Sequence, residues 1–222
     1  MIIINLILFT IQTFLWILFL SVIVGLIRLF VVGYKERYPN PLTDISVLKN
    51  GDIILTGKQS VTYSWYIQLS NVMTRKIKHR FWTHAAMYRG NGLLWEAQPQ
   101  GIIERPIQDY MKDGYIVRAF RHKYLIDEKV IDNAVQFCAD QKGCKYGTRA
   151  LIFYVFSTFT PSSFNYLFEN PFINKICNLD KAYFCSELVA DAFETAGYPV
   201  SPYDGWRVKP SDFISNPLLE PV

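Results

Sequence analysis

Residues 1–27 contain no charged side chain, and this run constrains the chain more than any other feature. It reads MIIINLILFTIQTFLWILFLSVIVGLI. As one helix it would extend about 40 Å at 1.5 Å per residue, and the hydrocarbon core of a bilayer needs only about 30 Å. A cleaved signal peptide would need a basic leader, a shorter apolar stretch and a small-residue cleavage site, and none is visible. The sequence therefore predicts one N-terminal transmembrane helix within residues 1–34.

Basic residues lie on one side of this predicted span. Arg28, Lys35 and Arg37 follow the run, and no basic residue precedes it. The positive-inside rule then predicts a single-pass membrane protein whose following domain lies in the cytoplasm. Two prolines in YPNPLTD stop a helix, so we expect a linker over 35–50 and a folded domain over 51–222.

The composition excludes several classes of protein. Half of the 222 residues are hydrophobic and 16% are aromatic, which is ample for a packed core. A net charge of +4 is too small to predict a nucleic-acid partner. Cys138, Cys144, Cys177 and Cys185 lack the paired spacing of zinc ligands. We therefore expect no metal and no other cofactor.

The remaining sequence predicts alternating strands and helices. GDIILT at 51–56 reads as a buried strand after a turn, and SWYIQLSNVMT at 64–74 reads as a helix. Residues 81–106 form two extended runs around Gly-Asn-Gly, a strong hairpin signal. A capped amphipathic helix follows at 127–143, and the apolar stretch 151–159 is too short to span a bilayer. This order predicts an α+β domain with an antiparallel sheet.

The segment RKIKHR at 75–80 is strongly basic. It could be a solvated loop. It could also contact anionic lipid headgroups, since each basic residue near such a surface contributes about 1 kcal/mol. The sequence leaves both interpretations open.

The segment AYFCSELVADAFETAG at 182–197 places a cysteine where an amphipathic helix begins. A thiol at that point faces unpaired N–H groups and the positive end of the helix dipole, which favour the thiolate. The alternative is that Cys185 is a small buried apolar residue. We expect Glu187, within the first turn, to face solvent or a basic side chain.

A cysteine nucleophile needs a base and a third group that orients the base. His84 alone among the histidines lies between apolar strand residues, whereas His79 and His122 lie in charged stretches. Glu96 and Gln98 share one face of the next strand. A two-residue loop would put His84 and Glu96 on opposite faces, a three-residue loop would set His84 across from Gln98, and a five-residue loop would set it across from Glu96. A triad with Glu96 thus requires an odd loop or a β-bulge.

Five segments together resemble a known family. They are GDIILT, WTHAAMY, LLWEAQPQGIIERPIQDYM, GCKYG and YFCSELVADAF, and they span 51–193. The sequence resembles the circularly permuted branch of the NlpC-type papain-like cysteine hydrolases, in particular the YiiX-like group, with lecithin–retinol acyltransferases as more distant relatives. The resemblance implies a permuted papain-like fold in which a helix carries the nucleophile. One departure is that Gly147 follows Tyr146 where the family commonly reads Tyr-Asp.

The resemblance also implies roles for individual residues. Cys185 would be the nucleophile, His84 the general base and acid, and Glu96 the group that orients His84. Candidates for stabilising the oxyanion or contacting the substrate are Tyr183, the backbone N–H of Cys185, Gln98 and Tyr146.

These features predict a membrane-anchored cysteine hydrolase that cleaves an amide or ester bond through an acyl-enzyme. The expected substrate is a lipid or a lipidated molecule, and the expected partner is the bilayer. One alternative is an endopeptidase or amidase that acts on peptidoglycan peptides. An alternative of another class is a catalytically silent, membrane-anchored binding module. A zinc site built from Cys185, His84 and Glu96 would lack a fourth ligand.

Overall fold

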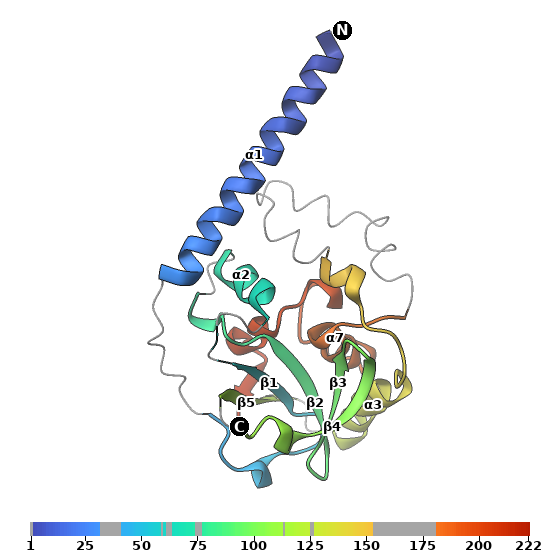
Figure 1. The fold of residues 1–222 in the computed structure, drawn as a ribbon. Helices are drawn as coiled ribbons and strands as arrows, with labels where there is room; N and C mark the ends of the chain where they lie inside the picture. Colours follow the sequence, from blue (N-terminus) through green and yellow to red (C-terminus); the bar gives the residue numbers. More distant parts are fainter. Residues whose placement is uncertain are drawn as a thin grey trace.

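A six-stranded antiparallel sheet lies at the centre of the domain (Figure 1). The computed structural model describes residues 2–31, 41–58, 60, 64–73, 77–112, 114–124, 127–152 and 181–222. The strands run in the order β4-β3-β2-β1-β5-β6. They are β1 (Ile53–Lys58), β2 (His84–Gly90), β3 (Leu93–Gln98), β4 (Gly101–Pro106), β5 (Tyr115–His122) and β6 (Leu219–Pro221). The predicted α+β class with an antiparallel sheet is confirmed.

Helices connect the strands and end close to the predicted boundaries. The α-helices named in Figure 1 are α1 (Ile2–Val31), α2 (Trp65–Met73), α3 (Glu128–Asp140) and α7 (Cys185–Thr195). Short 3-10 turns are η1 (Ile45–Val47), η2 (Ile77–His79), η3 (Ile107–Asp109), η5 (Gly205–Arg207) and η6 (Pro210–Ser215). The predicted helix at 151–159 lies mostly outside the described residues.

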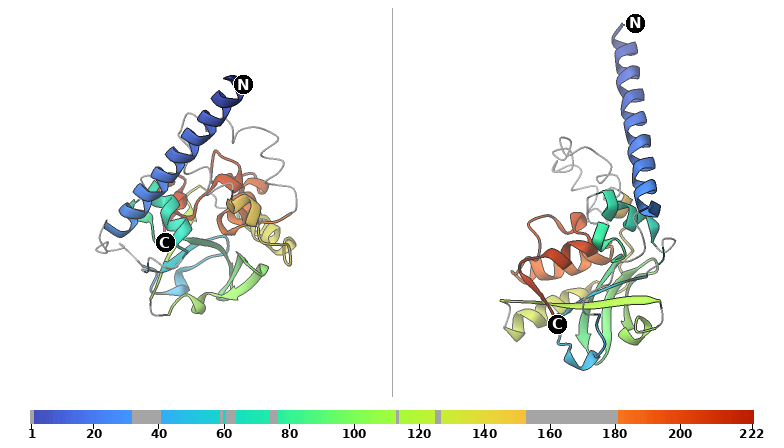
Figure 2. Two further views of the ribbon diagram at one scale, coloured as in Figure 1. Left: turned by 45° about the horizontal axis from the view of Figure 1, so that its top comes forward. Right: turned by 90° about the vertical axis from the view of Figure 1, so that its left-hand side faces the viewer.

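Both faces of the sheet are covered, because alternate residues of the central strands point into two different cores. On one face, α3 and α7 pack over β2 and β3 (Figure 2, right). Their apolar stripes meet Ile53 and Leu55 of β1 in the larger core. On the other face, Ile54 lies with Ile107 and Tyr110 in a second core, which residues of the segment before β1 also join. Helix α7 and the segment around η3 therefore lie on opposite faces.

The β2–β3 hairpin contains a β-bulge. Gly90 pairs with Leu93 across a two-residue turn, but the next pair is Tyr88 with Leu94, so Arg89 is an extra residue. A bulge of this kind leaves one residue unpaired and changes which residues face each other. The expected need for an odd loop or a bulge is confirmed.

The bulge fixes how the two site residues of the hairpin lie. Continuing the observed register sets His84 opposite Gln98 and Ala86 opposite Glu96. His84 and Glu96 are then diagonal neighbours on one face of the sheet, within reach of long side chains.

The expected membrane span is contradicted. Among the residues that the structure describes, we find no helix that is both long and apolar enough to cross a bilayer. This finding overturns the transmembrane helix predicted within 1–34 and, with it, the predicted single-pass membrane location.

The C-terminal part of α1 instead contacts the domain itself. Gly25 is buried against α2, where a methyl group at Gly25 would lie 2.8 Å from Leu69 and 2.6 Å from Met73. Figures 1 and 2 show this end of the helix beside α2 and the N-terminal end pointing away from the sheet. Apolar side chains on α1 that the domain leaves exposed include Phe9, Leu15, Trp16, Ile17, Phe19 and Leu20.

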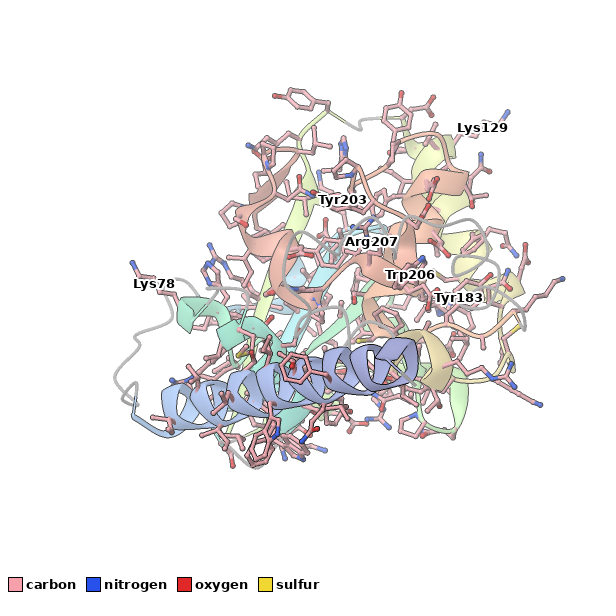
Figure 3. All side chains as sticks on the ribbon, turned by 90° about the horizontal axis from the view of Figure 1, so that it is seen from above. Lys78, Lys129, Tyr183, Tyr203, Trp206 and Arg207 are labelled. Atoms are coloured by element: carbon pink, nitrogen blue, oxygen red, sulfur yellow. The ribbon has the colours of Figure 1, made fainter. Side chains whose placement is uncertain are left out.

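The basic segment 75–80 does not form one exposed cationic surface. Arg80 is fully buried, and its guanidinium lies 4.5 Å from the ring centre of Phe81. Lys78 is exposed and projects outward at the edge of the molecule (Figure 3). Arg75 and Lys76 lie outside the described residues, so a headgroup contact stays a prediction for the rest of the segment.

The backbone of β1 at Gly57 lies very close to the backbone at Phe81, and this contact allows a prediction about stability. A methyl group added to Gly57 on β1 would lie 1.7 Å from the carbonyl oxygen of Phe81. We expect Gly57→Ala to lower the free energy of unfolding by at least about 2 kcal/mol, because the obstructing atom belongs to the backbone and cannot rotate away. Chemical denaturation measures this change. Gly143→Ala adds the same methyl in open space but at a φ of +82°, so it should cost only the roughly 1 kcal/mol of a left-handed backbone; equal losses would contradict the explanation.

Candidate active site

Two consecutive strands and a helix that follows much later in the sequence bring Cys185, His84 and Glu96 together. His84 is the first residue of β2, Glu96 lies within β3, and Cys185 is the first residue of α7. All three are buried, and Glu96 is fully inaccessible. The chain order is His, Glu, Cys, as the resemblance implies. Their catalytic roles stay predictions, but their geometry supports a linked set.

The contact between His84 and Glu96 is short. His84 Nε2 lies 2.7 Å from Glu96 Oε2, which is the distance of a charge-assisted hydrogen bond. Gln98, the alternative partner, has its Nε2 3.5 Å from the same ring nitrogen. The geometry therefore favours Glu96 over Gln98 as the group that orients the imidazole.

Glu96 accepts from three further side chains. Tyr110 donates its hydroxyl to Oε2 at 2.7 Å. On the other oxygen, Gln98 Nε2 donates at 3.1 Å and Arg105 Nε lies 3.1 Å away. These donors and His84 hold the carboxylate ionised: burial raises the pKa of Glu96, but the hydrogen bond and charge of His84, with Tyr110 and Arg105, outweigh it and lower the pKa.

The thiol of Cys185 hydrogen-bonds to His84 and lies next to two backbone donors. Because Glu96 takes Nε2, the ring nitrogen left for the thiol is Nδ1. The N–H groups of Ala85 and Ser186 also donate toward the sulfur. Burial raises the pKa of Cys185, but the hydrogen bond and charge of His84 and these N–H groups lower it overall.

The imidazole carries the positive charge of this pair. Burial lowers the pKa of His84, yet hydrogen bonds to Cys185 and Glu96 and their charges raise it to about 10. A lowered thiol pKa beside a raised imidazole pKa favours the proton on His84 rather than on the sulfur. These directions favour a thiolate–imidazolium pair, which is the reactive form of a cysteine nucleophile.

Glu187 corrects one expectation, since it faces neither solvent nor a basic side chain. It is 2% exposed, and its carboxyl accepts the N–H of Phe184 at 3.1 Å, which caps the start of α7. Burial, with the nearby Asp191, raises the pKa of Glu187 well above its usual range. The neutral form of the side chain is therefore favoured, which weakens its opposition to a thiolate at Cys185.

The two candidate tyrosines lie differently around α7. The pKa of Tyr146 is raised by burial and then by the negative charge at Cys185, which places this hydroxyl near the sulfur. The Tyr183 ring packs edge-to-face on Phe137 of α3, 6.0 Å between centres, and its backbone forms a bridge with Tyr146. An oxyanion role for either hydroxyl stays a prediction.

The sequence suggests a role for Tyr66 only as part of the aromatic segment 64–66, a candidate apolar surface for an acyl chain, and not as a neighbour of the nucleophile. Burial and then the charge at Cys185 raise its pKa, and its hydroxyl bonds to Ser64. Tyr66 lies on α2, more than a hundred residues before α7 in the chain, and no motif links the two segments. Only the folded arrangement shows that it belongs to the site.

A small apolar cluster surrounds the nucleophile. Ala150, Phe184, Cys185 and Trp206 are buried together, and Tyr146 and Leu151 pack against them. Figure 3 shows Trp206 on the segment after α7, near Tyr183. Gly147 lies in the same region, where a methyl group would come within 2.9 Å of the Phe184 nitrogen. The departure from Tyr-Asp at this position therefore allows two backbone segments to pack closely beside the nucleophile.

The thiols of the described cysteines should differ sharply in reactivity. We expect iodoacetamide to label Cys185 well below the pH at which an ordinary thiol reacts, because His84 lowers its pKa. Cys138 is fully buried with its sulfur 3.8 Å from that of Met87, and burial raises its pKa. Peptide mass spectrometry after brief labelling at pH 6 and pH 8 measures both. Equal labelling of Cys138 and Cys185 would contradict the ion pair.

Replacing the Glu96 carboxylate should weaken the ion pair of Cys185 and His84 more than replacing the Gln98 amide. Glu96→Gln removes the anion that stabilises the imidazolium, so the pKa of His84 should fall and that of Cys185 should rise. The labelling rate of Cys185 at pH 6 should then drop at least about tenfold, the effect of a shift of one pKa unit. Gln98→Ala keeps the anion and should change the rate far less. The reverse ranking would make Gln98 the orienting residue.

Comparison with known proteins agrees with the fold. No protein-family model and no curated protein matches the chain. Its fold is similar to a solved structure described as the metalloprotein yiiX from Escherichia coli O157:H7, of DUF1105. The TM-score is 0.50 at 17% identity, over 78% of this chain and 96% of the other. The YiiX-like part of the resemblance is therefore supported at the level of the fold, while the wider NlpC-type and lecithin–retinol acyltransferase relationships stay predictions.

Proposed function

We propose that the protein is a cysteine hydrolase that cleaves an amide or ester bond through an acyl-enzyme. The observation that carries this proposal is the buried chain of contacts from Cys185 through His84 to Glu96. A domain that only binds ligands has no chemical need for a thiolate, an imidazolium and an ionised carboxylate in that order.

The proposed reaction uses these three groups in two steps. The Cys185 thiolate attacks the carbonyl carbon, and the new C–S bond forms as the bond to the leaving nitrogen or oxygen breaks. His84 gives its ring proton to that leaving atom. A water molecule then gives a proton to His84 and adds to the thioester, which releases the carboxylic acid product and restores the thiolate. Glu96 stabilises the imidazolium at the start and end of this cycle.

The surroundings of the nucleophile favour an apolar acyl group. Phe184 and Trp206 are buried beside Cys185, with Leu151 packed against them. Trp65, half-exposed on α2, precedes Tyr66, which lies close to the sulfur. Such a lining fits hydrocarbon better than the polar backbone of a cell-wall peptide. We therefore propose a lipid or a lipidated molecule as substrate, with peptidoglycan peptides as the alternative.

A metal-dependent reaction does not fit these residues. The structural neighbour is described as a metalloprotein. In this chain, both oxygens of Glu96 are occupied by protein donors. Within the described ranges, no three His, Cys, Asp or Glu side chains are grouped to hold a metal ion. No step of the proposed reaction passes through a metal.

Product analysis with the full chain tests the proposal. We expect release of free fatty acid from long-chain acyl amides or esters in detergent micelles, and loss of that release in Cys185→Ala, which removes the nucleophile. Cys138→Ala is the matched control, because it removes a buried thiol outside the site, and it should retain activity. Cleavage of soluble muropeptides instead would identify a peptidoglycan enzyme. A folded protein with a reactive Cys185 but no hydrolysis of either substrate would favour the binding module.

A further inference from the structure

We propose that Arg105 and Tyr110 are positioning residues for Glu96, and that the charge of Arg105 sets the pH range in which Cys185 is reactive. This inference rests on the proposed function, because it treats Cys185 as the nucleophile. Neither residue touches the sulfur; both act through the carboxylate.

Four polar groups surround the Glu96 carboxylate. A carboxylate offers about four acceptor positions, two on each oxygen. Here Oε2 contacts His84 and accepts from Tyr110, while Oε1 accepts from Gln98 and lies 3.1 Å from Arg105 Nε in an ion pair. Glu96 is fully buried, so its carboxylate cannot rotate without losing one of these contacts.

The packing around Tyr110 fixes its hydroxyl at one acceptor position of the Glu96 carboxylate. It directly follows η3, is 2% exposed in the second core, and packs edge-to-face on Tyr115. Its ring lies 5.9 Å from the His84 ring, and its hydroxyl donates to the same oxygen that His84 uses. Tyr110 therefore determines where Oε2 lies, and Oε2 determines where the imidazole points.

Arg105 contributes a positive charge next to Glu96. Its side chain is 31% exposed while Glu96 is fully buried, so the guanidinium reaches in from the surface over the Tyr110 ring. A positive charge near an acid favours loss of its proton. Arg105 therefore favours ionised Glu96 and, at longer range, the thiolate, but it opposes protonation of His84.

Few other described groups near Glu96 and Cys185 carry a charge that would affect the pKa of the thiol. On the sheet side, Glu96 faces His84, Gln98 and Tyr110, and Arg105 also faces Asp109. On the helix side, Cys185 faces His84 and the neutral side chains Tyr66, Tyr146 and Glu187. Beside His84 itself, Arg105 is the cation among these described groups, and a guanidinium keeps its charge at every pH used to titrate the thiol.

Removing the Arg105 charge should move the pH profile of the thiol. With the full chain, we expect Arg105→Gln to shift the midpoint of Cys185 alkylation by iodoacetamide upward by about half a pH unit, as for a partly exposed ion pair. Arg105→Lys keeps the charge and should restore most of the midpoint. Arg89→Gln, which removes an arginine paired with Glu104 in the same sheet, should not shift it. An unchanged midpoint in Arg105→Gln, or an equal shift in Arg89→Gln, would overturn the role of Arg105.

Removing the Tyr110 hydroxyl should loosen His84 without changing the charge. The ring N–H proton of His84 that bonds Glu96 should exchange with water at least about tenfold faster in Tyr110→Phe, as measured by proton NMR, since one of two bonds to Oε2 is lost. Tyr88→Phe removes a hydroxyl that bonds only the Gly92 N–H and should leave the exchange unchanged. Equal exchange in Tyr110→Phe and the parent chain would overturn the positioning role.

These measurements do not depend on turnover, so they separate two failures. A shifted alkylation midpoint without hydrolysis of any substrate would support the roles of Arg105 and Tyr110 and contradict the proposed function. Hydrolysis that Cys185→Ala abolishes, with unmoved pH profiles and exchange rates in both variants, would support the function and overturn this inference.

Discussion

The contact between the buried His84 ring and the buried Glu96 carboxylate is the constraint on which the rest of the site depends. Two side chains on neighbouring strands meet only if they share a face, and a regular two-residue hairpin would have separated them. The extra residue, Arg89, shifts the register of the hairpin by one position, so His84 and Glu96 lie on the same face of the sheet. The α7 helix then needs only to present its first residue to the free nitrogen of His84, and its packing on β2 and β3 does so.

Burying three ionisable groups is costly unless each is satisfied. Glu96 is satisfied by donors on both oxygens, His84 lies between two anions, and the Cys185 sulfur faces two backbone N–H groups. The nearest potential conflict is Glu187, two residues along the same helix. Its burial and the nearby Asp191 raise its pKa, although the Phe184 N–H that it accepts as a helix cap lowers it. The same low polarity that would penalise an unpaired charge thus favours the neutral form of this carboxyl beside Cys185.

The local sequence pattern predicted many of the strands and helices of the site. It failed for features that depend on contacts between segments distant in the sequence. Alternation in the hairpin and the apolar stripe after Cys185 were enough to predict the strands, the nucleophile helix and the need for a bulge. Several loops were compatible with Gly90-Asn91-Gly92, so the position of the bulge depended on tertiary contacts. Charge alone suggested that Glu187 and Arg80 would be exposed, yet both are buried. The uncharged run at 1–27 predicted a membrane span from composition, which does not reveal that Gly25 packs on α2.

The order of the three residues along the chain has a consequence for biosynthesis. His84 and Glu96 lie in neighbouring strands and can pair early, but Cys185 follows about ninety residues later, and contacts of such long range form slowly. The last strand, β6, joins the sheet at β5 only when residues 219–221 have been made. A chain that has been made past residue 98 but not to residue 185 therefore carries His84 and Glu96 without Cys185. Such a chain lacks the thiol that the proposed reaction requires, so it is incapable of that reaction.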